Sequence, residues 1–524
     1  MPYQSGGGRR NNVQLGVGQS IWTGSTPAAI PERALDGLPG CLTWLALLLS
    51  IVGAVAFPRL LLLIAIALAL YSAFRFLLAG IANFMGLRKI RQWEATDWRE
   101  LYIQSAPPDA LAWDDVHHVI IIPNYKEPEG VLRATLDNLA AQYEARWRIT
   151  VVLAMEAAED MAVAKGEQLV QDYAHCFKNI YYTVHPRGLP SEMQCKSANE
   201  AWAARWARRK LVEEQRLSID NILVTTMDAD TQWHRHYIYA LTYLYAVNPE
   251  RHVRFWQAPI RYHSNIWDIN PLMRIINAYS TAFELAYLAA PWWMPMPMSS
   301  YSLSLKLLES SGYWDPDVIA DEWHMFIKAF FARDGEVKLE RVFLPFLAQA
   351  TTGENILDAI RNRYQQTLRH AWGTKEVGYS IAKTLEHPEI EFRRAFRLVF
   401  RISHDILLAG AGWVIMTLGS QLPLLLNPSL FQELVSSDSG RPLLIVFQVA
   451  FTMVSILGIV FWYQDVIVRP PRTRPQTLVE RFWTLISFPM LPVLTLIFVA
   501  LPTIQAQTRL LMGIPLQFRV TRKN

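Results

Sequence analysis

The sequence predicts an α/β domain with a mostly parallel sheet, placed between membrane-spanning helices. Of the 524 residues, 52% are hydrophobic and 18% are charged, whereas soluble chains carry roughly 25% charged residues. The apolar excess lies in two regions that flank a central segment of ordinary charge. In that segment strand-length apolar runs alternate with helical patterns, which is typical of a parallel sheet covered on both faces. These observations exclude a disordered chain, a coiled coil and an ordinary cytosolic enzyme.

The N-terminal region predicts a tail followed by a membrane hairpin. Residues 1–40 are rich in Gly, Ser and Asn and lack a signal-peptide pattern, so we expect a flexible cytosolic tail. Apolar runs at 41–57 and 60–81 are each close to the ~20 residues that cross a bilayer. We expect a transmembrane hairpin over residues 41–86, with one long kinked helix as the alternative. Basic residues at both flanks place both ends in the cytoplasm by the positive-inside rule.

The central segment, residues 92–350, carries the predicted α/β domain. Five strands are expected, at 118–123, 149–155, 180–184, 222–226 and 254–260. Helical patterns lie between them, at 129–142, 162–177, 196–211 and 235–247. Ligands of such sheets bind beyond the carboxyl ends of the strands, so polar residues at those ends are the candidate site residues.

The C-terminal region predicts about three more transmembrane helices over residues 401–510. Lipid-length apolar runs lie at 406–426, 443–466 and 482–503. The loop at 427–440 is acidic and the loop after residue 468 is basic, so we expect the first outside and the second in the cytoplasm. The prolines of the last run also allow a kinked or re-entrant segment. The basic tail, residues 511–524, favours the cytoplasm, whereas three simple spans would leave it outside.

Two aspartates follow the fourth predicted strand, in Thr-Thr-Met-Asp-Ala-Asp. Asp228 and Asp230 supply carboxylate oxygens, which Mg²⁺ or Mn²⁺ prefers and shares with substrate phosphates. Such a metal offsets the charge on a departing diphosphate. A pair of solvated loop acids is the alternative interpretation of this motif alone.

Other strand ends and one helix start also carry polar residues. The first strand runs into Pro123, Tyr125 and Glu127, as at a nucleotide-binding rim. Glu156 ends the second strand, where a carboxylate can accept a hydrogen bond from a base such as uracil. Lys196 opens a helix, a position from which it can contact phosphate or a sugar hydroxyl. For each of them a solvated surface residue is the alternative.

Two later segments complete the candidate site. Asp321 and Glu322 open a helix and can supply a general base, or merely complement the helix dipole. Gln366, Arg369 and Trp372 share helix faces that mix amide, guanidinium and aromatic groups, as a diphosphate or sugar site needs. An interfacial helix with snorkelling arginines is the alternative. We expect amphipathic interface helices over residues 351–400.

The order of these motifs resembles the membrane-integrated branch of family 2 glycosyltransferases, which includes cellulose synthases and hyaluronan synthases. The resemblance covers residues 115–375 and includes Phe-Trp-Gln-Ala-Pro, which is similar to that branch's strand ending in Gln-x-Pro. It implies an α/β GT-A type (Rossmann-like) cytosolic domain inserted between transmembrane α-helices. It also implies a nucleotide-sugar donor and an inverting transfer.

The resemblance implies a role for each candidate residue. Those expected to bind the nucleotide or the substrate are Pro123, Tyr125, Glu127, Glu156, Lys196, Asp228, Gln257, Gln366, Arg369 and Trp372. Asp230 is expected to bind the metal. Glu322 is expected to deprotonate the acceptor hydroxyl, with Asp321 as its rival because the pair reads Asp-Glu, the reverse of the family's order. His370 stands where polymerising members have Trp, which weakens the case for processive synthesis.

We therefore expect an inverting, Mg²⁺- or Mn²⁺-dependent hexosyltransferase that uses a UDP-sugar, held in the plasma membrane with its catalytic domain in the cytosol. The expected acceptor is a polysaccharide whose synthesis is coupled to translocation, or alternatively a lipid-linked or membrane-proximal acceptor. An inactive transferase-like scaffold or transporter is a third reading, although sparse intramembrane charge argues against a carrier. A net charge of +4 is too small to indicate nucleic acid.

Overall fold

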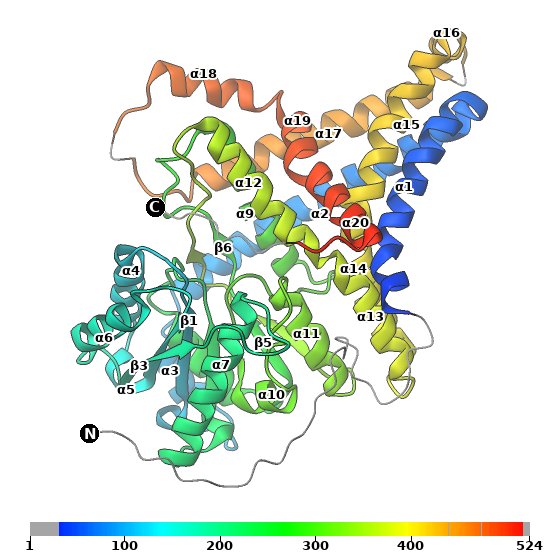
Figure 1. Cartoon of the computed structure of the whole chain (residues 1–524). Coiled ribbons are helices and arrows are strands. Elements are labelled where there is room, and N and C mark those ends of the chain that lie inside the picture. The colour runs from blue at the N-terminus through cyan, green and yellow to red at the C-terminus, as the bar shows by residue number, and fades with distance from the viewer. Residues whose placement is uncertain (1–30, 439, 473, 517–524) are drawn as a thin grey trace.

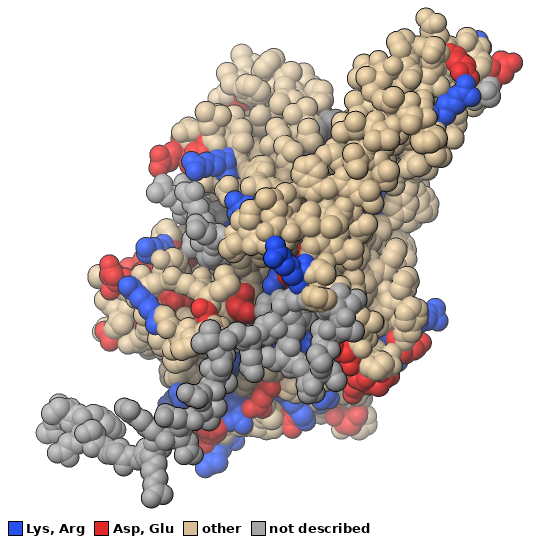
Figure 2. Space-filling model, turned by 45° about the vertical axis from the view of Figure 1, so that its right-hand side comes forward, with Lys and Arg blue, Asp and Glu red and all other residues tan. Residues whose placement is uncertain are grey.

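The computed structural model describes residues 31–438, 440–472 and 474–516. Most of the predicted N-terminal tail and the basic C-terminal Arg519, Arg522 and Lys523 lie outside these residues. An α/β domain occupies one side of the molecule and long helices the other (Figure 1). The surface of these helices is almost without charged side chains, which gather on the α/β domain and at the tip beside α16 (Pro428–Ser436) (Figure 2).

A seven-stranded sheet of order β3-β2-β1-β4-β7-β5-β8 forms the centre of the α/β domain. Its strands are β1 (His117–Pro123), β2 (Ile149–Glu156), β3 (Asn179–His185), β4 (Ile222–Thr226), β5 (Arg254–Gln257), β7 (Tyr301–Ser304) and β8 (Lys338–Arg341). Only β7 runs antiparallel to its neighbours. The carboxyl ends of β1, β2, β4 and β5 therefore meet at one edge.

Helices cover both faces of this sheet because the strands are apolar on both sides. Ile120 and Ile122 of β1 pack into one core, and Val119 and Ile121 pack into the other, as the two-residue side-chain period of a strand requires. The first core contains α4 (Glu129–Ala140), α6 (Ala162–Tyr173) and α8 (Tyr237–Val247). The second contains α7 (Lys196–Arg208), α10 (Leu305–Ser310), α11 (Asp321–Ala332) and α13 (Lys375–Glu386).

The predicted strands are confirmed, with one correction. Four of them match the observed strands to within one residue at each end. The run expected at 254–260 is instead divided: β5 ends at Gln257, and β6 (Ile260–Arg261) pairs with β9 (Phe346–Leu347) in a separate two-stranded sheet. Pro259 lies at the division, and proline has no N–H to donate to a strand ladder.

Five helical stretches of the described residues are long and apolar enough to cross a membrane: Arg33–Ala56, Pro58–Glu94, Phe392–Leu426, Gly440–Val466 and Val493–Met512. They belong to α1 (Glu32–Ala56), α2 (Pro58–Glu94), α14–α15 (Phe392–Leu407 and Trp413–Leu426), α17 (Gly440–Val466) and α19–α20 (Leu491–Thr495 and Leu501–Met512). The first two are separate helices with Phe57 between them.

The last apolar run, for which the sequence predicts either a span at 482–503 or a kinked or re-entrant segment, is divided near Pro489. α18 (Leu478–Ser487) ends before Pro489, and the helix resumes at Leu491. Leu494 then packs in one cluster with Ile266. The segment around Ile266 adjoins the α/β domain, where Asn265 donates a hydrogen bond to the Ala350 carbonyl.

The C-terminal end of this run, α20, also lies beside the α/β domain. α20 lies antiparallel to the first part of α1, where Thr43 donates a hydrogen bond to Gln507 Oε1 at 2.6 Å. This part of α1 touches α13 of the α/β domain. Gly378 of α13 allows this close approach because it has no side chain, and any Cβ there would meet the backbone of Leu35. Both ends of the segment Val493–Met512 thus lie beside the α/β domain.

Candidate active site

A cavity of about 750 Å³ lies at the carboxyl edge of the sheet. Its walls come from the ends of the strands, the first turns of α7 and α11, α12 (Ile356–Ala371) and the apolar helices. The predicted site residues that line it are Pro123, Tyr125, Glu127, Glu156, Lys196, Asp228, Asp230, Asp321, Glu322, Gln366 and Arg369. The topology brings them together because parallel strands end at one edge.

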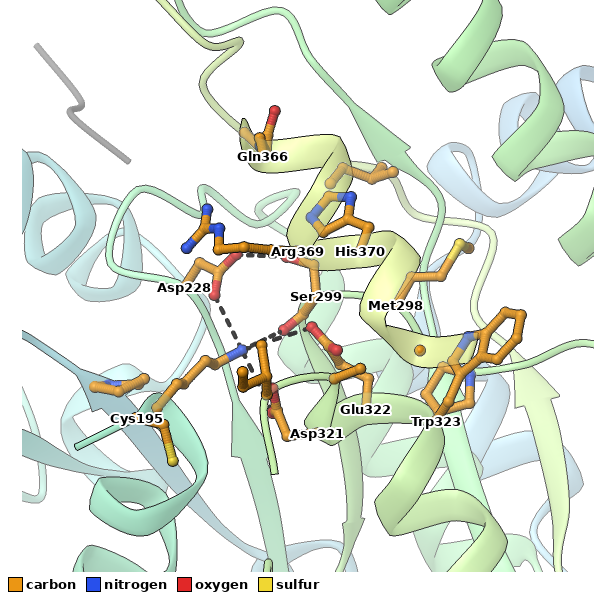
Figure 3. A pocket seen from close by; sticks show the side chains of 18 of the residues that line it. Cys195, Asp228, Met298, Ser299, Asp321, Glu322, Trp323, Gln366, Arg369 and His370 are labelled. Carbon is orange, nitrogen blue, oxygen red and sulfur yellow. Dashed lines mark hydrogen bonds and ion pairs between the residues drawn. The ribbon is translucent and has the colours of Figure 1, made fainter. Parts of the chain in front are cut away.

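In this cavity the carboxylates of Asp228, Asp321 and Glu322 lie around one space (Figure 3). Lys196 lies between them. Its Nζ lies 3.0 Å from Asp228 Oδ1, 3.7 Å from Glu200 Oε1, 3.8 Å from Asp321 Oδ2 and 3.9 Å from Glu322 Oε1. Burial opposes the charged form, but the carboxylates, Asp228 first, raise the pKa of Lys196 well above its ordinary value. Sequence reasoning missed Glu200, although it stands four residues after Lys196 on the same helix face.

The two adjacent acids of α11 have different surroundings. The Asp321 side chain is 4% exposed, whereas that of Glu322 is 26% exposed. Burial, followed by the charge of Glu322, raises the pKa of Asp321 well above its ordinary value. Burial also raises the pKa of Glu200, which interacts with Asp321. Burial thus disfavours the ionised form of Asp321, and Glu322 is the more open carboxyl of the two in α11.

Asp228 and Asp230 follow β4 and both line the cavity. Asp228 Oδ2 accepts a hydrogen bond from Ser299 Oγ at 2.7 Å, and Asp230 Oδ2 accepts one from the Gln349 backbone N–H at 2.9 Å. Among the described residues no group of three or more His, Cys, Asp or Glu side chains could hold a metal ion. The two carboxylates are ligands of the type that Mg²⁺ and Mn²⁺ bind, and further ligands would have to come from substrate oxygens and water.

The rim formed by β1 and β2 is shaped by buried polar side chains. Glu156 is buried, and its Oε2 lies 3.2 Å from His185 Nδ1. Burial opposes protonation of His185, but the carboxylates of Glu156 and Glu192 raise its pKa. The Asn199 side-chain amide donates to the Ala154 carbonyl at 2.7 Å, which ties the start of α7 to the end of β2. Sequence reasoning did not single out His185 or Asn199.

Two predicted residues do not line the cavity. Gln257 is buried, and its Oε1 accepts a hydrogen bond from the Met298 backbone N–H at 2.8 Å, so it holds a segment of the cavity wall. Trp372 packs beside Leu368 and Ala506 instead.

α12 presents the predicted Gln366 and Arg369 to the cavity, and His370 as well. Burial, together with the Arg369 charge, lowers the pKa of His370 to about 4, so its ring is neutral at pH 7. Burial also lowers the pKa of Arg369, and the charges of Asp228 and Glu322 oppose that shift.

The cavity continues toward the apolar helices. Asp405, Ile406, Ala409 and Thr503 line it there. Tyr262 and Glu284 also line it, and sequence reasoning missed both. The available signal for Glu284 was that it is the one acidic residue of α9 (Pro271–Ala289).

No protein-family model matches the sequence, and a search of curated proteins finds no match. Among solved structures the chain is similar to the mannosyltransferase PcManGT from Pyrobaculum calidifontis in complex with GDP-Man and Mn²⁺, with a TM-score of 0.43 and 16% identity, over 78% of this chain and 98% of that one. It is also similar to S. aureus TarS 1–349, with a TM-score of 0.29 and 12% identity, over 72% and 91% of the two chains. The cavity and its side chains, rather than these distant likenesses, define the candidate site.

Proposed function

We propose that the protein is an inverting glycosyltransferase that moves a hexose from a UDP-sugar to a glycan acceptor at the cytoplasmic face of the plasma membrane. One observation carries the proposal: Lys196, Asp228, Asp230 and Glu322 converge on one cavity at the carboxyl edge of a parallel sheet. A cationic side chain and two aspartates that can hold a metal suit a diphosphate leaving group. An open carboxylate suits a hydroxyl nucleophile, because it can accept the hydroxyl proton.

The donor half of the reaction uses the strand ends. Pro123, Tyr125, Glu127 and Glu156 border the nucleotide in this proposal. Asp230, with Asp228 beside it, would hold Mg²⁺ or Mn²⁺, and the bound metal would supply charge stabilisation for the departing UDP. Lys196, which contacts Asp228, contributes positive charge to this half of the reaction. Arg369 contributes a second positive charge.

The acceptor half uses the start of α11. Glu322 takes the proton of the acceptor hydroxyl while its oxygen attacks the anomeric carbon. The new carbon–oxygen bond forms as the bond to the UDP oxygen breaks, so a single displacement inverts the configuration. Asp321 is less suited to this step because its side chain is buried and burial disfavours its ionised form.

The acceptor is proposed to be a growing polysaccharide whose synthesis is coupled to translocation, because the cavity extends to residues of the apolar helices such as Asp405 and Thr503. The second candidate is single transfer to a lipid-linked or membrane-proximal acceptor. It is favoured by the neutral His370 in the cavity and by Trp372, which packs elsewhere. Sizing the product separates the two, since a long polymer supports the first and a one-sugar glycolipid the second.

A donor panel tests the proposed function. The purified full chain is incubated with UDP-sugars and Mn²⁺, and UDP release is measured, with the Asp230→Asn variant as control. We expect release with one or a few donors and its loss in the variant. No release with any donor, together with no effect of Asp230→Asn, would instead indicate an inactive membrane scaffold.

A further inference from the structure

The membrane-facing end of the cavity contains a polar pair that the proposed donor and base chemistry does not use. Glu284 lies on α9, which packs against α2 and α17, and Tyr262 follows β6. The Tyr262 hydroxyl donates a hydrogen bond to Glu284 Oε1 at 2.9 Å. Both side chains line the same cavity as Asp228 and Glu322.

The Glu284 carboxyl has one oxygen without a protein partner. Oε1 accepts the bond from Tyr262, while Oε2 is buried and has no hydrogen-bond partner in the described part of the protein. Burial raises the pKa of Glu284 to about 8, although the Tyr262 hydrogen bond and the charge of Arg363 both lower it. Glu284 is therefore mostly neutral at pH 7, and its carboxyl proton can be donated to a ligand.

The surroundings select the chemistry of that ligand. A divalent cation is disfavoured because Glu284 is mostly protonated and because the charge that acts on its pKa is the cation of Arg363. A phosphate is disfavoured because Glu284 becomes an anion on losing its proton, and Arg363 is already bonded to Gln366 Oε1 at 3.0 Å and to Ser280 Oγ at 3.3 Å. A neutral hydroxyl group can accept from the Glu284 carboxyl, and the apolar Pro297 and Met298 line the same cavity.

We propose that Glu284 and Tyr262 form an acceptor subsite that binds a hydroxyl group of a neutral sugar presented from the membrane side. The inference rests on the proposed glycosyl transfer and names its acceptor class: a carbohydrate hydroxyl, free or on a glycolipid, rather than a lipid phosphate. Glu284 donates to the sugar oxygen, and Tyr262 holds the carboxyl in place. Glu284 is a specificity-determining residue here and takes no part in the displacement.

Acceptor kinetics test this subsite. The full chain is supplied with its best donor and either octyl β-glycosides of glucose, galactose and mannose or octyl phosphate. Glu284→Leu should raise the KM of the glycoside at least tenfold, while donor affinity and donor hydrolysis by water stay unchanged. Glu284→Gln is the matched control: its amide keeps the shape and can still donate, so its KM should stay within about threefold of the wild type.

The pH profile supplies a readout that lost packing would not produce. The wild-type acceptor KM should rise above pH 8, as Glu284 loses its proton, and Glu284→Gln should abolish that rise. Tyr262→Phe removes a bond that stabilises the ionised carboxyl, so it should move the rise to higher pH.

Three results would overturn the subsite: an unchanged acceptor KM in Glu284→Leu, weakened donor binding in that variant, or transfer to octyl phosphate with none to any glycoside. Failure of the proposed function is distinct, because the wild type would then release no UDP from any donor. That result would overturn the subsite as well, since the subsite depends on glycosyl transfer.

Discussion

Replacement of either acid at the start of α11 tests which one is the base. Glu322→Gln keeps the size of the side chain but removes its capacity to accept a proton. A positioned general base contributes typically 10²–10⁴-fold in rate, which corresponds to about 3–5 kcal/mol of activation free energy. We expect kcat to fall by that factor. UDP affinity should be retained, because Glu322 is not proposed to hold the nucleotide and lies 3.9 Å from Lys196, which is the longest of the four Lys196–carboxylate distances.

Asp321→Asn is the matched control, since it changes the neighbouring residue in the same conservative way. The Asp321 side chain is 4% exposed and its pKa is raised by burial, so the variant removes a carboxyl that is less open to the acceptor than Glu322 is. Its kcat should fall less than about tenfold. The assay is UDP release together with product formation, and UDP binding is measured by calorimetry. Wild-type turnover in Glu322→Gln combined with lost turnover in Asp321→Asn would refute the assignment.

Three other predictions concern the metal, the buried His324 with its two carboxylate partners, and Trp372, which packs outside the cavity. Asp230→Asn should raise the Mn²⁺ concentration for half-maximal activity at least tenfold, and chelation should abolish UDP release from the wild type; metal-independent turnover would contradict this. His324 is buried between Asp315 and Glu376, and although burial opposes its charge, these carboxylates raise its pKa from 6.5 to about 9. Its contribution of roughly 3 kcal/mol should be complete below pH 6.5 and lost as the pH rises through 9, so Tm should fall over that window, and His324→Gln should flatten the fall. Trp372→Leu should lower Tm through lost packing against Ala506 while leaving acceptor KM within about twofold; a large rise in KM with unchanged Tm would show that Trp372 contacts the acceptor.

The residues at strand ends were predictable because two local patterns agree there. A buried strand is recognised by its apolar run, and the acid or proline that ends it marks the edge where ligands bind. Asp228, Glu156 and Pro123 could therefore be named before their neighbours were known. Glu200 and Glu284 could not be named, because their place in the site depends on burial and on contacts with elements distant in the sequence.

Helix periodicity also has a limited range. It places Gln366 and Arg369 correctly on the cavity side of α12. α12 ends at Ala371 and tightens into a 3₁₀ turn over Trp372–Thr374. A 3₁₀ turn advances by three residues per turn, so the angular position of Trp372 no longer follows from the preceding helix. In the C-terminal region, hydropathy gives the length of an apolar run but not the side of the membrane to which its ends return.

Because the α/β domain and the apolar helices share the walls of the cavity, the protein cannot be cut between them without opening the cavity. Asp405 and Thr503 belong to the apolar helices, and Tyr364 of α12 donates a hydrogen bond to Gln505 of α20 at 2.7 Å. A soluble fragment cut before α14 would keep the strand ends and α11, but it would lack part of the acceptor wall and the support of α12. Such a fragment should still bind nucleotide and fail in transfer, so full-length protein in lipid or detergent is the form in which its activity has to be measured.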